Sequence, residues 1–181
     1  MAEKKTKIVI RPAVAMDSVN IVRLIKAGYY ETGASEIGPL DEQKLLEYVT
    51  TTLRHAFVLV AEQHIPSKGG RIHGTIALAP IRMPWCSIAV LAECWFAVTD
   101  AYRSRGIPQQ LVEATDTFLD QRNMVGFYGT QMLTPPALND VFEERGRQGY
   151  REARHTFIRL PNQPTAVDGR PVLPPKRQLA S

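Results

Sequence analysis

The stretch IAVLAECWFAV at residues 88–98 is the feature that most limits the folds open to this chain. Ten of its eleven residues are apolar, and Glu93 is the exception. A continuous apolar run of this length, bounded by turn residues, is typical of a strand that is covered on both faces. The sequence therefore predicts a sheet with helices packed against both of its sides.

The rest of the chain supplies strands and helices for such a fold. Alternating or β-branched patterns predict further strands at 7–13, 56–62, 71–81, 125–133 and 149–160. Apolar residues at helical spacing predict helices at 16–29, 41–56, 108–121 and 137–147. We therefore expect an α+β fold, with a central mixed, mostly antiparallel sheet of about six strands flanked by about four helices.

The charged residues are unevenly distributed along the chain. Residues 1–7 and 161–181 each carry a net charge of +2, which together account for the formal charge of +4. The stretch between them is neutral, whereas a nucleic-acid-binding domain normally has a basic face, so we expect no nucleic-acid partner. We predict a flexible basic N-terminus at 1–6, one domain at 7–160, and a disordered tail at 161–181, which contains five prolines.

The two cysteines, Cys86 and Cys94, indicate neither a metal site nor a disulfide framework. Neither belongs to a CxxC pair or lies among histidines at zinc-binding spacing, so we expect two buried thiols in a reducing compartment. The sequence contains no apolar run long enough to span a membrane and no apolar segment of signal-peptide length. These features predict a cytoplasmic protein that does not associate with membranes.

The segment AYRSRGIPQQL, residues 101–111, follows the apolar strand and precedes a helical pattern. The first N–H groups of a helix have no partners within it, and the helix dipole favours an anion at that end. Gly106 has no Cβ, so a phosphate group can approach the backbone closely, and Arg103 and Arg105 add positive charge. The turn is therefore a candidate phosphate site, although a solvated turn has the same composition.

Several stretches resemble the GCN5-related N-acetyltransferase (GNAT) superfamily. The segment CWFAVTDAYRSRGIP is similar to the strand that binds acetyl-CoA in this family and to its Arg/Gln-x-x-Gly-x-Gly/Ala loop. The segments IVIRPAVAMDSVNIVRLI, GRIHGTIAL and NDVFEERGRQGYREARHTFIRL are similar to its first strand and helix, to a glycine-bearing strand, and to its last helix and strand. The resemblance spans about residues 7–160 and implies a single acyltransferase domain.

This resemblance assigns cofactor-binding roles to particular positions. The backbone from Arg103 through Ser104, Arg105 and Gly106 to Ile107 would hold the pyrophosphate of acetyl-CoA. The main chain of Phe96, Ala97 and Val98 would bind the pantetheine arm, and Asn139 resembles a helix asparagine near its thiol end.

Two positions depart from the family pattern. Pro108 stands where the loop has Gly or Ala; it suits the first turn of a helix but has no N–H to donate. Many members place a tyrosine on the last helix to protonate the thiolate, but here the aligned position is Arg145 or Gly146 and the nearest aromatic residue is Phe142. Tyr128 and Tyr150 are alternative candidates for this proton donor, and the sequence does not decide between them.

Glu93 is the candidate catalytic base. A carboxylate in an apolar strand is costly to bury, and burial shifts the pKa of such a group toward the range useful for proton transfer. Its position also resembles that of the glutamate base in histone-acetylating members of the family. The alternative is a structural role, in which Glu93 points outward or pairs with Arg82 or Arg159.

The sequence is compatible with two functions. The first is an acetyl-CoA-dependent N-acetyltransferase that transfers acetyl directly to an amine of a small molecule or a protein. The second is a protein-binding module on the same fold, with weak or no catalysis, which Pro108 and the missing helix tyrosine favour. A homodimer is compatible with both.

Overall fold

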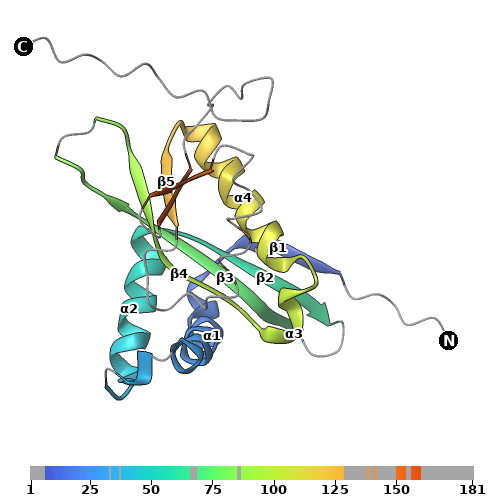
Figure 1. Cartoon of the computed structure of the whole chain (residues 1–181). Helices are drawn as coiled ribbons and strands as arrows, with labels where there is room; N and C mark the ends of the chain where they lie inside the picture. The colour runs from blue at the N-terminus through green and yellow to red at the C-terminus, as the bar shows by residue number, and fades with distance from the viewer. Residues whose placement is uncertain are drawn as a thin grey trace, which may run out of the picture.

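A computed structural model of the chain describes residues 7–32, 34–36, 38–65, 69–84, 87–128, 138, 141, 150–153 and 156–159 (Figure 1). The predicted terminal segments 1–6 and 161–181 lie outside these residues, as do Cys86, Asn139 and the greater part of the predicted helix 137–147.

Seven described strands form one mixed sheet. In chain order they are β1 (Ile8–Pro12), β2 (Phe57–Ile65), β3 (Gly69–Ile81), β4 (Val90–Val98), β5 (Val125–Tyr128), β6 (Tyr150–Ala153) and β7 (Thr156–Arg159). Their order in the sheet is β1-β2-β3-β4-β5-β7-β6, and only β4 and β5 run parallel. The predicted α+β class and the mostly antiparallel sheet are confirmed.

The strand count was predicted as about six, and the described residues form seven strands. The predicted strand at 149–160 is a hairpin, in which β6 folds back on β7 with Ala153 opposite Thr156. Alternation between polar and apolar residues has the same period in one long strand as in two short antiparallel ones. The sequence pattern therefore did not reveal the turn.

The described α-helices are α1 (Ser18–Glu31), α2 (Glu42–His55), α3 (Asp100–Arg103) and α4 (Ile107–Arg122), with short 3₁₀ turns η1 (Ala15–Asp17) and η2 (Ala34–Glu36). The predicted helices at 16–29, 41–56 and 108–121 are confirmed. The single turn α3 was not predicted, because four residues carry no helical periodicity. Asp41 is the N-cap of α2, at the helix start that the sequence predicts. Its carboxylate accepts a hydrogen bond from the Lys44 N–H at 3.0 Å.

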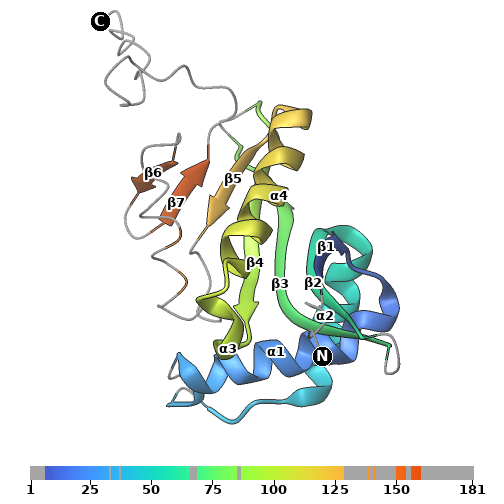
Figure 2. The same cartoon turned by 90° about the vertical axis from the view of Figure 1, so that its right-hand side faces the viewer.

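Helices cover both faces of the sheet, as the apolar run at 88–98 required (Figures 1 and 2). On one face α4 packs on the strands through buried residues that include Leu111, Leu119, Ile76 and Phe96. On the other face α1 and α2 form a second core, which includes Ile21, Val49, Val60 and Trp95. Residues of β4 contribute to both cores, which places this strand at the centre of the domain.

A bulge in β4 sets which residues face which core. Glu93 lies opposite Leu78 and Trp95 lies opposite Ala77, so Cys94 is the extra residue between two pairs. Cys94 is buried, as predicted, and both Cys94 and Trp95 belong to the core beneath α1 and α2. The Trp95 indole N–H donates to the Thr75 hydroxyl at 3.2 Å, which satisfies its polar group inside that core.

Candidate functional site

One edge of β4 has few strand pairs among the described residues. Within the described residues, β4 pairs with β5 only at Val90, Leu91 and Ala92. Beyond that point the two strands diverge, and β5 points away from the end of β4 in Figure 2. The part of β4 after Ala92 keeps its pairing with β3 on the other edge, from Glu93 to Val98. Among the described strands, none therefore pairs with this edge of β4 beyond Ala92.

The turn after β4 leads directly into a helix N-terminus. Gly106 is the N-cap of α4 and has φ 74° and ψ 11°, a left-handed conformation that favours glycine. The N–H of Gln110 donates to the Gly106 carbonyl at 3.1 Å, so the helical bonds begin there. Helix geometry leaves the N–H groups of Ile107 and Gln109 without intrahelical acceptors, while Pro108 has no N–H.

The side chains of the two arginines in the turn, Arg103 and Arg105, differ in their contacts and exposure. The Nε of Arg103 donates to the Val98 carbonyl at 3.0 Å, and its terminal nitrogens bind the carboxylate of Glu31 at the end of α1. Hydrogen bonding to Glu31 raises the pKa of Arg103. Arg105 is exposed, and its guanidinium carbon lies 4.9 Å from the centre of the Tyr102 ring. Of the two predicted side chains, Arg105 is therefore the one that an anion reaches without breaking an ion pair.

A polar cluster lies beneath this turn. The His73 ring stacks on Tyr102 with 3.8 Å between their centres, and both His73 Nε2 and the Tyr102 hydroxyl lie within hydrogen-bond distance of Gln63 Oε1. The Thr99 N–H donates to the His73 carbonyl at 2.8 Å. Burial lowers the pKa of His73, and the charges of Arg71, Arg23 and Arg105 lower it further. These contacts fix α3 against the sheet and hold the start of the turn.

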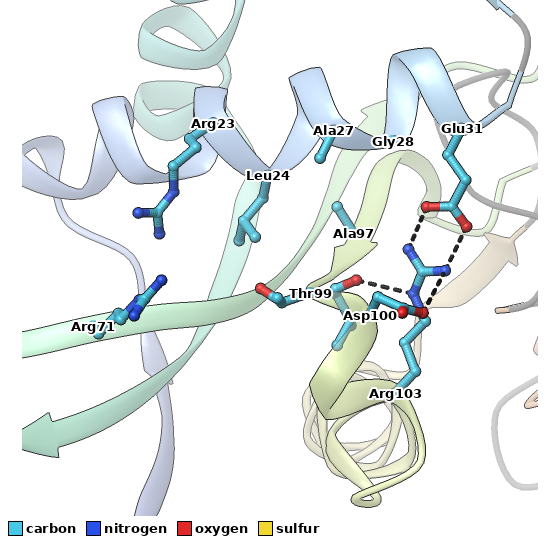
Figure 3. Close-up of a pocket in the computed structure, with 11 residues that line it drawn as sticks. Arg23, Leu24, Ala27, Gly28, Glu31, Arg71, Ala97, Thr99, Asp100 and Arg103 are labelled. Atoms are coloured by element: carbon cyan, nitrogen blue, oxygen red, sulfur yellow. Dashed lines mark hydrogen bonds and ion pairs between the residues drawn. The ribbon is translucent and has the colours of Figure 1, made fainter.

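A cavity of about 340 Å³ lies between α1, the start of β3 and the end of β4 (Figure 3). Its walls include Ala97, Val98 and Thr99 of the β4 end, together with Arg23 of α1 and Arg71 of β3. The Glu31–Arg103 ion pair lines the end nearest the turn. The cavity therefore places the end of the predicted cofactor strand and two basic side chains, Arg23 and Arg71, in the walls of one space.

Glu93 is 1% exposed. The alternative in which it points outward is therefore wrong. Its register opposite Leu78, before the bulge, places it just beyond the part of β4 that pairs with β5. It shares this strand with Phe96, Ala97 and Val98, each of which is 3% exposed or less. The predicted base and the predicted pantetheine-binding residues therefore lie on one strand, β4.

Ser104 and Ile107 complete the predicted turn. Ser104 is exposed and ends α3, whereas Ile107 is buried and packs in the core beneath α4. Arg23 and Arg71 were not identified from the sequence as functional candidates. They are distant along the chain, and only the packing of α1 over β3 brings them to one cavity.

Solved structures provide the comparison with known proteins. The chain is similar to a predicted acetyltransferase from Clostridium acetobutylicum with acetyl-CoA (17% identity, TM-score 0.62, covering 82% of this chain and 92% of that one). It is also similar to a GNAT family acetyltransferase from Brucella melitensis in complex with acetyl-CoA (16% identity, TM-score 0.61, 88% and 90% covered). A possible acetyltransferase from Clostridium difficile 630 shares 23% identity at TM-score 0.53, with 66% and 76% covered.

These similarities show that the chain has the fold of the GNAT superfamily. No protein-family model matches the sequence, and neither does any curated protein sequence. Among the described helices, none is both long and apolar enough to cross a membrane.

Proposed function

We propose that this chain, which has the GNAT fold, is an N-acetyltransferase that uses acetyl-CoA and transfers the acetyl group directly to an amine. The observation that carries the proposal is that β4 leads directly into the left-handed Gly106 turn and the start of α4, and that no described strand pairs with its β5-facing edge beyond Ala92. An extended strand edge suits an amide-bearing arm, and unpaired helix N–H groups suit a pyrophosphate. Two structural neighbours contain acetyl-CoA, which supports this choice of cofactor.

The residues present fit that cofactor. Among the described residues, Gln110 Nε2, at 3.8 Å, is the one atom within 4 Å of the position that a Cβ of Gly106 would occupy, so these residues leave room beside the turn. Ile107 and Gln109 supply N–H donors, and the exposed Arg105 supplies charge. The main chain of Phe96, Ala97 and Val98 would hold the pantetheine arm. Asn139, proposed near the thiol end, lies outside the described residues.

When bound, the cofactor would supply the acetyl group as a thioester: the amine nitrogen would gain a bond to the acetyl carbon, the C–S bond would break, and CoA would leave as the thiol. Glu93 is proposed to take the proton from that amine, directly or through water. A backbone N–H near Val98 is proposed to donate to the oxygen that becomes negative during transfer. The buried setting of β4 strengthens both interactions because it excludes water. The acceptor is an amine of a small molecule or of a protein.

Calorimetric titration with acetyl-CoA tests this proposal. Micromolar affinity supports it, and no binding at millimolar acetyl-CoA would remove it. Glu93→Gln should then lower turnover with acetyl-CoA affinity unchanged. The matched control is Glu47→Gln, which alters an exposed carboxylate on α2. Unchanged turnover in Glu93→Gln rejects Glu93 as the base.

A second candidate is a protein-binding module on the same fold. The structure gives it one specific observation, because the Arg103 side chain binds Glu31 and Val98 instead of facing an incoming anion. Together with the donor missing at Pro108, this reduces the number of groups that can hold a pyrophosphate. The same titration separates the two candidates, since a pure docking module does not bind acetyl-CoA.

A further inference from the structure

The two ends of the cavity beneath α1 differ in charge. At one end the guanidinium of Arg103 is neutralised by Glu31. At the other end Arg23 of α1 and Arg71 of β3 extend toward one another across the cavity (Figure 3). Arg23 Nη2 donates to the Ile72 carbonyl at 3.3 Å. In the part of the chain that the structure describes, neither Arg23 nor Arg71 forms an ion pair.

Arg23 and Arg71 are both exposed residues, so solvent screens the repulsion between their guanidinium groups, and an anion bound between them would remove the repulsion that remains. The planar guanidinium presents donors in a fork that matches the oxygens of a carboxylate or phosphate. The positive field of the pair extends into the protein, because the charges of Arg71 and Arg23 add to burial in lowering the pKa of His73. The geometry at this end of the cavity is thus suited to an acidic group.

The cavity also reaches the proposed site of acetyl transfer. Its wall contains Ala97 and Val98, which are the β4 residues proposed to hold the pantetheine arm. A molecule that occupies the cavity therefore extends from the arginine pair to the end of β4. An amine that binds with its acidic group between Arg23 and Arg71 has that group at the opposite end of the cavity from the Glu31–Arg103 pair.

We propose that Arg23 and Arg71 bind a carboxylate or phosphate group of the acceptor, so that the substrates are amines that also carry an acidic group. This inference rests on the proposed acetyltransferase function. The same chemistry is present in the 3′-phosphate of the cofactor, and the experiments below separate the two sources.

The first experiment needs no cofactor and uses inorganic phosphate as the probe. Its affinity is measured by following the Arg Nε–H signals in NMR spectra of the full chain and of Arg23→Gln/Arg71→Gln. We expect the Arg23 and Arg71 signals to shift and the double variant to bind at least tenfold more weakly. The control Arg54→Gln/Arg82→Gln removes the same total charge from exposed positions outside the cavity. An equal loss of affinity in both double variants, or none in either, overturns the proposal.

Arg71→Gln alone guards against a folding defect, because Arg23 has a structural bond to Ile72. We expect this single variant to keep the circular dichroism spectrum of the parent and to bind phosphate at least threefold more weakly. Parent-like affinity in a folded Arg71→Gln chain counts against the pair as an anion site.

The second experiment measures acetylation of 5-aminopentanoate and of pentylamine, which differ only in the acidic group. We expect kcat/KM to favour 5-aminopentanoate at least tenfold, and the preference to disappear in Arg23→Gln/Arg71→Gln. Equal use of both amines by the parent chain overturns the proposal. If the chain binds phosphate through the pair but fails to bind acetyl-CoA, the proposed function fails while the anion site stands.

The affinities for acetyl-CoA and for 3′-dephospho-acetyl-CoA identify the source of the anion. We expect the ratio of these affinities to be the same in the parent chain and in Arg23→Gln/Arg71→Gln. A ratio that collapses toward one in the double variant assigns the pair to the cofactor and overturns the acceptor role.

Discussion

Arg103 and Glu31 form a two-point ion pair that joins the turn after β4 to the last residue of α1. Arg103 Nη1 binds Glu31 Oε1, and Arg103 Nη2 binds Glu31 Oε2 at 2.5 Å. The Nε of the same guanidinium donates to the Val98 carbonyl at 3.0 Å. One side chain therefore fixes the end of β4, the turn and α1 relative to each other.

The first prediction concerns this ion pair. Arg103→Gln should lower the free energy of unfolding by about 1 kcal/mol, because the pair is two-pronged but partly exposed at Glu31. Arg103→Lys should recover only part of the loss, since an ammonium cannot make both bonds. Urea unfolding of Arg103→Gln, Glu31→Gln and the double variant measures the coupling. Strictly additive effects would show that the pair contributes nothing.

The second prediction concerns Asp17, which is 6% exposed. Burial alone would raise its pKa, but hydrogen bonds from Arg11 and the Val14 N–H, with the charge of Arg11, hold the pKa below its usual range. The unfolded chain therefore binds the proton more readily, so this stabilisation is present above pH about 4 and is lost as the pH falls through the lowered pKa. Asp17→Asn should cost about 2 kcal/mol at pH 7.

The difference between the parent and Asp17→Asn should shrink as the pH falls below about 4. Thermal unfolding between pH 2.5 and 7 measures it. Glu47→Gln, an exposed carboxylate on α2, should stay within about 0.5 kcal/mol of the parent at pH 7. A difference for Asp17→Asn that is constant across this range contradicts the assignment of the lowered pKa to Asp17.

The sequence predicted the central part of the fold because local patterns determine it. The apolar run at 88–98 led to β4 and to a sheet covered on both faces, and the stripes at 16–29, 41–56 and 108–121 led to three helices. Periodicity did not reveal the hairpin of β6 and β7 or the single turn α3. The hairpin depends on a single chain reversal, and α3 contains four residues. Neither is long enough to produce a periodic pattern in the sequence.

The candidate site was predicted less completely, for a different reason. Glu93 lies within the apolar segment 88–98, and the turn follows that segment directly. Both could therefore be proposed as site residues from the sequence alone. The partner of Arg103 is Glu31, and the cavity pairs Arg23 with Arg71; both relationships arise from the packing of α1 over the sheet. No spacing in the sequence encodes a contact between positions that only the tertiary fold brings together.

The third prediction concerns Gly74 on β3. A Cβ at this position would lie 3.0 Å from Leu111 Cδ1, 3.2 Å from Ile107 Cγ2 and 3.3 Å from Val98 Cγ2. Gly74→Ala should therefore cost about 1–3 kcal/mol, since it overpacks the contact between β3 and the start of α4. Gly38→Ala is the matched control, because no atom of the described residues lies within 4 Å of its Cβ position. Urea unfolding that ranks the two variants equally would contradict the close approach at Gly74.

The fourth prediction separates affinity from stability at Pro108, which is buried in the first turn of α4. Pro108→Ala restores one N–H beside Ile107 and keeps a strong helix former at that position. If the turn holds the pyrophosphate, an added hydrogen bond to a charged group should tighten acetyl-CoA binding about tenfold. The same substitution should lower the free energy of unfolding by about 0.4–1 kcal/mol, because the unfolded chain regains the freedom that proline removes.

Calorimetry and urea unfolding measure the two effects of Pro108→Ala, which have opposite signs. Pro80→Ala, at an exposed position of β3, should change stability alone. Unchanged or weaker acetyl-CoA binding by Pro108→Ala would mean that the turn does not use an N–H at this position, and would favour the docking module.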